Sequence, residues 1–295
     1  MEHKIDISVV VPFYKGNAYI NELVENVTQT ARTLSYQWGA SMEILIVNDS
    51  PWVPVELTAQ THLPVRILPN EKNLGIHGSR IHGIREARGE YIQLLDQDDL
   101  LIPETYPDQF LLAQGQDLTV GNAEYYFGKS KRLIYPNEKV MKYYICGRRF
   151  REIRDLIASP GHCLIRRDAF PAYWLENPMT VNGADDYYLW MLMFENPGLR
   201  LKLNPKPVYI HRNNAEGNLS FDLQRMHKSN LEMCDLLAKN PLYPKKHEAV
   251  LHRSIVFKYL YDTKQLKLLD WLKYADKVLD NGVYKIYTKV LTLLK

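Results

Sequence analysis

Short apolar runs alternate with segments of helical spacing along the first third of the chain. Residues 7–11 form a largely β-branched run, which is typical of a strand buried on both faces. Apolar residues then recur at helical spacing from Ile20 to Val27, which predicts a helix. The same alternation predicts three further strands, at 43–47, 65–68 and 91–95, and a helix at 76–88.

This order of elements predicts an α/β fold with a mostly parallel, mixed central sheet. Strand–helix–strand units form right-handed crossovers, and ligands of such sheets bind beyond the carboxyl ends of the strands. The chain carries its unusual polar residues at these predicted ends, in segments 12–14, 48–50 and 96–99. We therefore expect the functional site at this edge of the sheet.

The rest of the chain is less regular and ends in a helical region. Shorter strands are predicted at 118–126, 161–166 and 207–211, and a helix at 185–194. Helical patterns dominate 222–239 and 248–295. We predict a catalytic domain at 1–220 and a C-terminal helical extension at 221–295.

The end of that extension is basic as well as apolar. Residues 264–295 carry seven Lys against three Asp, interleaved with apolar residues. Such a helix pair could rest on anionic lipid, pack on the catalytic domain or join a second subunit as a homodimer. The sequence leaves these three alternatives open.

Composition narrows the class of protein. Hydrophobic residues make up 46% and charged residues 24% of the chain, a globular balance. The net charge of +3 gives no argument for a nucleic-acid partner, and we expect none. Three widely spaced cysteines without a CxxC pair argue against a disulfide framework or a zinc site. With no apolar leader at the N-terminus, we expect a cytoplasmic protein, working at the inner face of the cell membrane if lipid is bound.

Five segments form one ordered pattern between residues 7 and 103. They read Val-Val-Val-Pro-Phe-Tyr at 9–14, Ile-Leu-Ile-Val-Asn-Asp-Ser at 44–50, Asn-Leu-Gly at 73–75, Ala-Arg-Gly-Glu-Tyr at 87–91 and Leu-Asp-Gln-Asp-Asp at 95–99. In this order and spacing they resemble the family 2 glycosyltransferases, and a looser match continues to about residue 220. The resemblance implies a GT-A, Rossmann-like fold and transfer of a hexose or N-acetylhexosamine from a UDP-sugar.

The resemblance assigns the acidic segment 96–99 to the donor's diphosphate. A divalent cation, Mn²⁺ or Mg²⁺, prefers oxygen ligands and neutralises charge on the leaving nucleotide. By resemblance Asp98 is a direct metal ligand, while Asp96 contacts the ribose or a metal-bound water and Gln97 belongs to the same donor site. The alternative for this segment is a solvated acidic turn.

Other positions are assigned to the donor in the same way. Asp49 resembles the acceptor of the uracil N3–H, although a turn or N-cap role is the alternative. Pro12 and Tyr14 resemble the segment that packs against the base. Arg80 is expected near the diphosphate, unless it is only a solvated helix position. The loop over the donor is expected to depend on Asn73 and Gly75.

Histidines and a neighbouring arginine extend the predicted site. His211 resembles a metal or diphosphate contact, and Arg212 a phosphate contact. His162 falls where the acceptor wall is expected. His77 and His82 have no third ligand beside them, so we expect them in a loop and on a helix surface.

The second chemical centre is the acidic pair Asp185-Asp186 at the start of a predicted helix. It resembles the acidic pair of the family, in which the second acid is the general base. Inverting transfer is a single displacement, so Asp186 is expected to deprotonate the acceptor hydroxyl and Asp185 to orient the acceptor. The alternative is an acidic first turn that complements the helix dipole.

Two rival functions stay open at this point. A sugar nucleotidyltransferase would show a Gly-rich phosphate loop where this chain has Pro-Phe-Tyr-Lys at 12–15. A non-catalytic nucleotide-sugar-binding scaffold would not need the acids 96, 98 and 186. The family resemblance implies a glycan or lipid-linked saccharide acceptor, in the synthesis of bacterial polysaccharide such as O-antigen or capsule.

Overall fold

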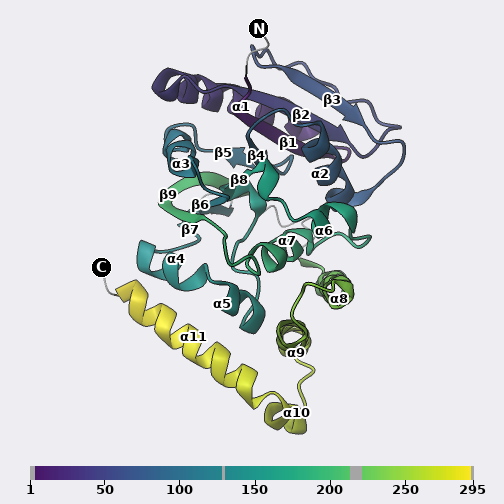
Figure 1. Cartoon of the computed structure of the whole chain (residues 1–295), viewed down its shortest axis with the longest axis vertical. Coiled ribbons are helices and arrows are strands. Elements are labelled where there is room, and N and C mark those ends of the chain that lie inside the picture. Colours follow the sequence, from purple (N-terminus) through teal and green to yellow (C-terminus); the bar gives the residue numbers. More distant parts are fainter. Residues whose placement is uncertain (1–3, 128–129, 213–220, 294–295) are drawn as a thin grey trace. The chain divides into compact units, whose positions relative to one another are not determined.

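The computed structural model describes residues 4–127, 130–212 and 221–293, and these divide between two compact units (Figure 1). The sheet unit comprises Met1–Ile134, Ser159–Phe170 and Gly198–Asn214. The helical unit comprises Tyr135–Ala158, Pro171–Pro197 and Ala215–Lys295. The predicted boundary at residue 220 falls outside the described residues, so a division into catalytic domain and extension stays a prediction.

The sheet unit contains one mixed sheet in the order β3-β2-β1-β4-β8-β6-β9-β5, with β7 paired to β6. Its strands are β1 (Ile7–Phe13), β2 (Met42–Asn48), β3 (Val65–Pro69), β4 (Tyr91–Leu94), β5 (Leu100–Leu101), β6 (Leu118–Phe127), β7 (Ser130–Leu133), β8 (Cys163–Arg166) and β9 (Leu201–Arg212). Strands β1 to β4 are parallel, and antiparallel β8 joins them to the parallel pair β6 and β9. The helices of this unit are α1 (Asn17–Trp38), α2 (Gly75–Glu86) and α3 (Tyr106–Ala113), with 3-10 turns at Pro160–His162 and Arg167–Ala169.

The β-branched run of β1 is buried on both faces, as its pattern predicts. Val9 and Val11 belong to the core that includes the buried stripe of α1. Val10 faces the other way, where Gly83 of α2 lies so close that a β-carbon there would overlap the Val10 side chain. Glycine at 83 thus allows α2 to pack directly on β1 and β2.

Among the described residues, the helical unit contains five helices of five to nine residues and three of 17 to 19 residues. They are α4 (Glu138–Tyr144), α5 (Gly147–Glu152), α6 (Ala172–Glu176), α7 (Asp185–Met193), α8 (Leu223–Lys239), α9 (Lys245–Asp262), α10 (Leu268–Lys273) and α11 (Ala275–Leu293). The helical pattern predicted at 248–295 corresponds to the three helices α9, α10 and α11. Within the described residues, none of the helices combines the length and the hydropathy that a membrane span requires.

Two sequence-based expectations need correction. His77 is not at the surface: it lies in α2 and is buried, because the helix turns this position toward the sheet. The strand predicted at 207–211 begins already at Leu201 and continues to Arg212, because β9 pairs along most of β6 across an irregularity near Asn122.

Candidate functional site

The parallel strands β1, β2 and β4 end side by side, and their polar loops are joined by hydrogen bonds. The backbone N–H of Asp49 donates to the carbonyl of Phe13 (2.8 Å), and that of Lys15 donates to Ser50 Oγ (3.1 Å). Gln97 Oε1 accepts from the backbone N–H of Tyr14 at 2.9 Å. The segments that the sequence placed at one edge of the sheet therefore form one connected surface.

This hydrogen bond gives Gln97 a structural role. Its amide also donates to the Tyr14 carbonyl at 3.3 Å, so the side chain holds both backbone groups of that residue. Tyr14, in contrast, is 44% exposed and follows the end of β1, two residues after Pro12. Gln97 fixes the loop that carries the Tyr14 ring, and the Lys15 ammonium lies over this ring, 5.3 Å from its centre.

Asp49 holds the start of α2. Its Oδ1 accepts from the backbone N–H of Leu74 (2.6 Å) and from Asn70 Nδ2 (2.8 Å), and its Oδ2 accepts from the N–H of Gly75 (2.9 Å). Leu74 is the N-cap position of α2, and no side chain of its own caps the helix. The buried Asp49 carboxylate therefore supplies the cap from a distant loop.

The loop around residue 75 needs both residues that the sequence singled out there. Gly75 has φ +76°, a left-handed conformation that favours glycine. Asn73 Oδ1 accepts from the same Gly75 N–H at 3.0 Å.

The Asp49 carboxylate has about four positions at which it can accept a hydrogen bond. The three hydrogen bonds that it accepts within the protein leave about one position for a donor on a ligand.

Arg80 points into the site rather than into solvent. Its side chain is buried, and Nη2 lies 2.6 Å from Asp96 Oδ1. The alternative of a solvated helix position is wrong, because α2 directs this residue at the sheet edge. Asp96 keeps a quarter of its side chain exposed beside this pair.

Asp99 ties the acidic segment to the end of β9. Its buried carboxylate accepts hydrogen bonds from the Tyr209 hydroxyl and from the backbone N–H of Arg212 (2.7 Å), and lies 3.0 Å from His211 Nδ1. This leaves Nε2 of His211 as the ring nitrogen available to a cation or phosphate. Burial opposes charge on His211, but the hydrogen bond and charge of Asp99, with Asp96 and Asp98, raise its pKa overall.

Asp98 lies between two other acids. Burial, followed by the charges of Asp99 and Asp96, raises the pKa of Asp98 to about 6. Bound positive charge would favour the ionised carboxylate, so the donor set fits a hard divalent cation. In the described part of the chain, however, no three His, Cys, Asp or Glu side chains are arranged to hold a metal. Ligands from a bound diphosphate would have to complete such a site.

Two other predicted contacts are engaged elsewhere. The guanidinium of Arg212 forms an ion pair with Glu22, with Nη1 2.8 Å from Glu22 Oε2. His162 does not line a wall for an acceptor: it is fully buried, and its Nδ1 lies 2.6 Å from the carbonyl of Gly121. Burial lowers the pKa of His162 to about 4, so the ring is neutral.

The acidic pair lies in the helical unit, in the first turn of α7. Asp185 is buried, and its carbonyl accepts from Trp174 Nε1 at 2.8 Å. Asp186 is more accessible, and its Oδ1 accepts from the backbone N–H of Tyr187 at 2.7 Å. The sequence places both acids at the helix start, and the fold exposes only the second of them.

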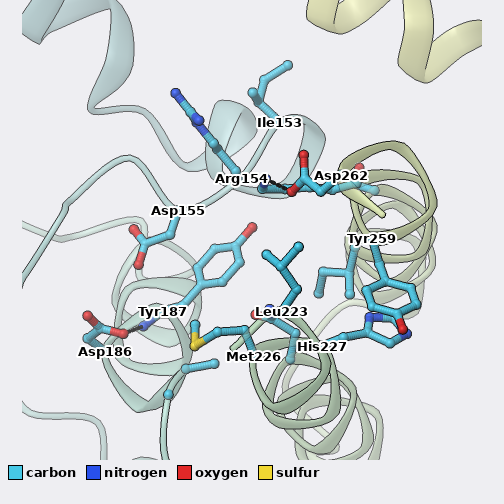
Figure 2. Close-up of a pocket in the computed structure, with 16 residues that line it drawn as sticks. Ile153, Arg154, Asp155, Asp186, Tyr187, Leu223, Met226, His227, Tyr259 and Asp262 are labelled. Carbon is cyan, nitrogen blue, oxygen red and sulfur yellow. Dashed lines mark hydrogen bonds and ion pairs between the residues drawn. The ribbon is translucent and has the colours of Figure 1, made fainter. Parts of the chain in front are cut away.

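Asp186 lines a pocket of about 210 Å³ within the helical unit (Figure 2). Helices α8 and α9 contribute Met226, His227 and Tyr259 to its wall, and the rings of His227 and Tyr259 stack with centroids 3.9 Å apart. Asp155 faces the same pocket, where burial and the charge of Asp186 raise its pKa well above the ordinary range. Sequence reasoning missed Asp155, because it lies in the irregular segment 128–160 and no motif marks it.

Helix α8 also holds the loop that leads to the acidic pair. Ser229 Oγ accepts from the backbone N–H of Ala184 (3.0 Å) and donates to the carbonyl of Val181 (2.8 Å). Glu232 accepts from the backbone N–H groups of Thr180 and Val181, both at 2.8 Å. Helix α8 therefore helps to hold the loop that precedes Asp185 and Asp186.

Comparison with known proteins gives a consistent result. Residues 8–174, more than half of the chain, match the profile described as "Glycosyl transferase family 2". An uncharacterized glycosyltransferase of Haemophilus influenzae is 33% identical over 33% of this chain and 31% of its own length. The minor teichoic acid biosynthesis protein GgaB of Bacillus subtilis is 29% identical over 34% of this chain and 11% of its own length. The chain thus spans less than a third of these two relatives. The uncharacterized glycosyltransferase YibD of Escherichia coli is 23% identical over 95% of this chain and 86% of that protein.

Solved structures support the fold. Residues 1–349 of TarS from S. aureus, in complex with UDP-GlcNAc, align with a TM-score of 0.60 at 16% identity, over 95% of this chain and 81% of that one. The mannosyltransferase PcManGT of Pyrobaculum calidifontis, in complex with GDP-Man and Mn²⁺, aligns with a TM-score of 0.53 at 15% identity. The alignment covers 98% of this chain and 84% of that one. These likenesses confirm the predicted GT-A fold class.

Proposed function

The chain belongs to glycosyl transferase family 2, and from this membership we propose that it is an inverting enzyme that uses a UDP-sugar. The proposed donor carries a hexose or N-acetylhexosamine, and the proposed acceptor is a glycan or lipid-linked saccharide in bacterial polysaccharide synthesis, such as O-antigen or capsule. The teichoic acid protein among its relatives and the UDP-GlcNAc complex among its structural neighbours support this choice.

One observation carries the donor side of the proposal. The acidic segment 96–99, the Asp49 loop and the Tyr14 loop meet at the carboxyl edge of three parallel strands. We assign the base to Pro12 and Tyr14, the uracil N3–H to Asp49, and the ribose to Asp96. Arg80 keeps Asp96 in place through their 2.6 Å ion pair.

Asp98, supported by Asp96 and His211, is assigned to a divalent cation, Mn²⁺ or Mg²⁺. A bound cation would neutralise the charge that grows on the diphosphate as the bond to the sugar breaks. The raised pKa of Asp98 agrees with this assignment, since a bound cation would favour its ionised carboxylate.

Asp186 is the proposed general base. Its carboxylate takes the proton of the acceptor hydroxyl, whose oxygen forms a bond to the anomeric carbon as the bond from that carbon to the diphosphate breaks and UDP leaves. The pocket beside Asp186 is the proposed binding place of the acceptor, and its stacked His227–Tyr259 pair offers a flat wall. Asp185, which is buried, is assigned to keeping this turn in position.

We place the protein in the cytoplasm, at the inner face of the cell membrane, where lipid-linked acceptors are found. The alternative role of the C-terminal helices is to form the interface of a homodimer.

Nucleotide binding and turnover test the proposal together. We expect calorimetry to show UDP binding that Mn²⁺ strengthens and EDTA abolishes, with weaker binding of GDP and CDP. We expect UDP release when a panel of UDP-sugars is supplied with saccharide acceptors. Absence of metal-dependent UDP binding would overturn the donor assignment, and binding without any UDP release would favour the scaffold alternative.

A further inference from the structure

The last two helices turn large apolar side chains toward solvent. On α10, Leu268, Leu269 and Leu272 are at least 75% exposed, and Trp271 is 43% exposed. On α11 five apolar residues are between 46% and 75% exposed: Leu279, Val283, Ile286, Val290 and Leu293. Spacings of four, three, four and three residues place these five on one face of the helix, which we call the α11 stripe.

The stripe is not the face by which α11 packs on its own unit. That packing uses Tyr284, which is buried and lies 5.0 Å, centroid to centroid, from Tyr144 of α4. Asn137 Nδ2 donates to the carbonyl of Leu291 at 2.9 Å, and Arg253 of α9 pairs with Asp276 at 2.7 Å. Since these contacts fix the orientation of α11, its apolar stripe stays outward.

The charges around the stripe are positive. Five exposed lysines lie on or next to α10 and α11: Lys264, Lys267, Lys273, Lys285 and Lys289. Among the residues that the structure describes, none of these five forms an ion pair with a carboxylate. The aspartates of the region are engaged: Asp276 by Arg253, Asp280 by Lys277 (2.9 Å), and Asp270 by the backbone N–H of Lys267 (2.9 Å).

We propose that α10 and the α11 stripe bind an anionic lipid surface. Exposed leucine, isoleucine and valine side chains enter the boundary between headgroups and acyl chains, while the lysines meet the anionic headgroups. The helices lie in the plane of the surface, in agreement with the lack of a spanning helix among the described residues. The identity of this membrane rests on the proposed function, because the membrane is the one that carries the lipid-linked acceptor.

Charge argues for lipid over a second copy of the chain. In an antiparallel two-fold pairing of the stripes, Lys285 and Lys289 of both copies would lie on the same rim, where like charges repel. Anionic headgroups offer the opposite sign to the same lysines.

Co-sedimentation of the full chain with vesicles tests the proposal. We expect binding to vesicles of equal amounts of phosphatidylglycerol and phosphatidylcholine, and binding weaker by about tenfold or more to phosphatidylcholine alone. The double variant Val283→Asp/Ile286→Asp should lose the binding, and Lys285→Gln/Lys289→Gln should weaken it about thirtyfold. Matched controls are Leu242→Asp, at a leucine of the same unit that is 88% exposed, and Lys245→Gln/Lys246→Gln at the start of α9; both should bind as the parent does.

Two further measurements make each outcome decisive. Light scattering without lipid reports a dimer, and a dimer that Val283→Asp/Ile286→Asp disrupts would replace the lipid proposal by a protein interface. Equal binding to neutral vesicles, no binding at all, or unchanged binding of the stripe variant would each overturn the proposal. UDP binding without lipid should be the same for every variant, so a failure of the donor assignment is recognised separately from a failure of lipid binding.

Discussion

The guanidinium of Arg80 lies 2.6 Å from the carboxylate of Asp96, and the arginine side chain is almost completely buried. The pair connects α2 to the loop after β4. The buried positive charge of Arg80 offsets the negative charge of the Asp96 carboxylate.

Removal of the arginine should destabilise the protein. Arg80→Met leaves Asp96 without its partner in a partly buried setting, so we expect the free energy of unfolding to fall by about 2–4 kcal/mol. Urea unfolding without nucleotide measures this loss. Lys206→Met, which breaks the exposed pair with Asp108, is the matched control and should change stability by no more than about 1 kcal/mol. Equal losses of stability in the two variants would show that the Arg80–Asp96 pair stabilises the fold no more than an exposed ion pair does.

Asp49 should support the loop as well as the nucleotide. In Asp49→Asn the amide nitrogen faces a backbone N–H, so at least one bond to Leu74 or Gly75 is lost. We expect the free energy of unfolding to fall by about 1–3 kcal/mol and UDP binding to weaken with it. Glu71→Gln, an exposed charge on the same loop, is the control. Unchanged stability together with a lost preference for UDP over CDP would mean that base recognition is the main role of Asp49.

Asp186→Asn should separate binding from transfer. An amide cannot accept the acceptor's proton, so we expect transfer to fall by about 10²–10⁴-fold while UDP binding stays unchanged. The assay is UDP release with a saccharide acceptor, next to calorimetry with UDP alone. Asp235→Asn on the exposed side of α8 should retain full activity. Near-parental transfer by the Asp186 variant would refute its role as the base.

Asp155 should make stability depend on pH. Burial and the charge of Asp186 raise its pKa in the folded state well above that of an unfolded aspartate, near 3.9. The folded protein therefore keeps a proton that the unfolded chain releases, and its stability falls as pH rises above about 4 toward the folded pKa. Asp155→Asn is neutral throughout and can still accept the Ile157 N–H. The variant should gain stability relative to the parent as the pH rises above about 4, and urea unfolding at a series of pH values measures this gain. A pH-independent difference would show that Asp155 titrates as an ordinary aspartate.

The pattern of apolar and polar residues was sufficient to predict the parallel half of the sheet and the edge where its polar loops meet. Local patterns were sufficient there, because a β-branched run such as β1 and the helical stripe of α1 each encode one buried element. The family resemblance added the acids 96, 98 and 186 as candidates. It also placed Asp186 in the first turn of a helix, which the structure has as α7.

The contacts of these side chains could not be predicted from local patterns. Whether Arg80 faces solvent or Asp96, and whether Asp49 caps its own turn or α2, depends on packing between elements that are distant in sequence. The same holds for His162, which was predicted at the acceptor wall and is buried by the fold, and for Asp155, whose importance comes from its neighbour Asp186. The outward direction of the α11 stripe is likewise set by contacts of its opposite face with α4. Periodicity shows that a helix has two faces, but only the packing of its neighbours determines which face is covered.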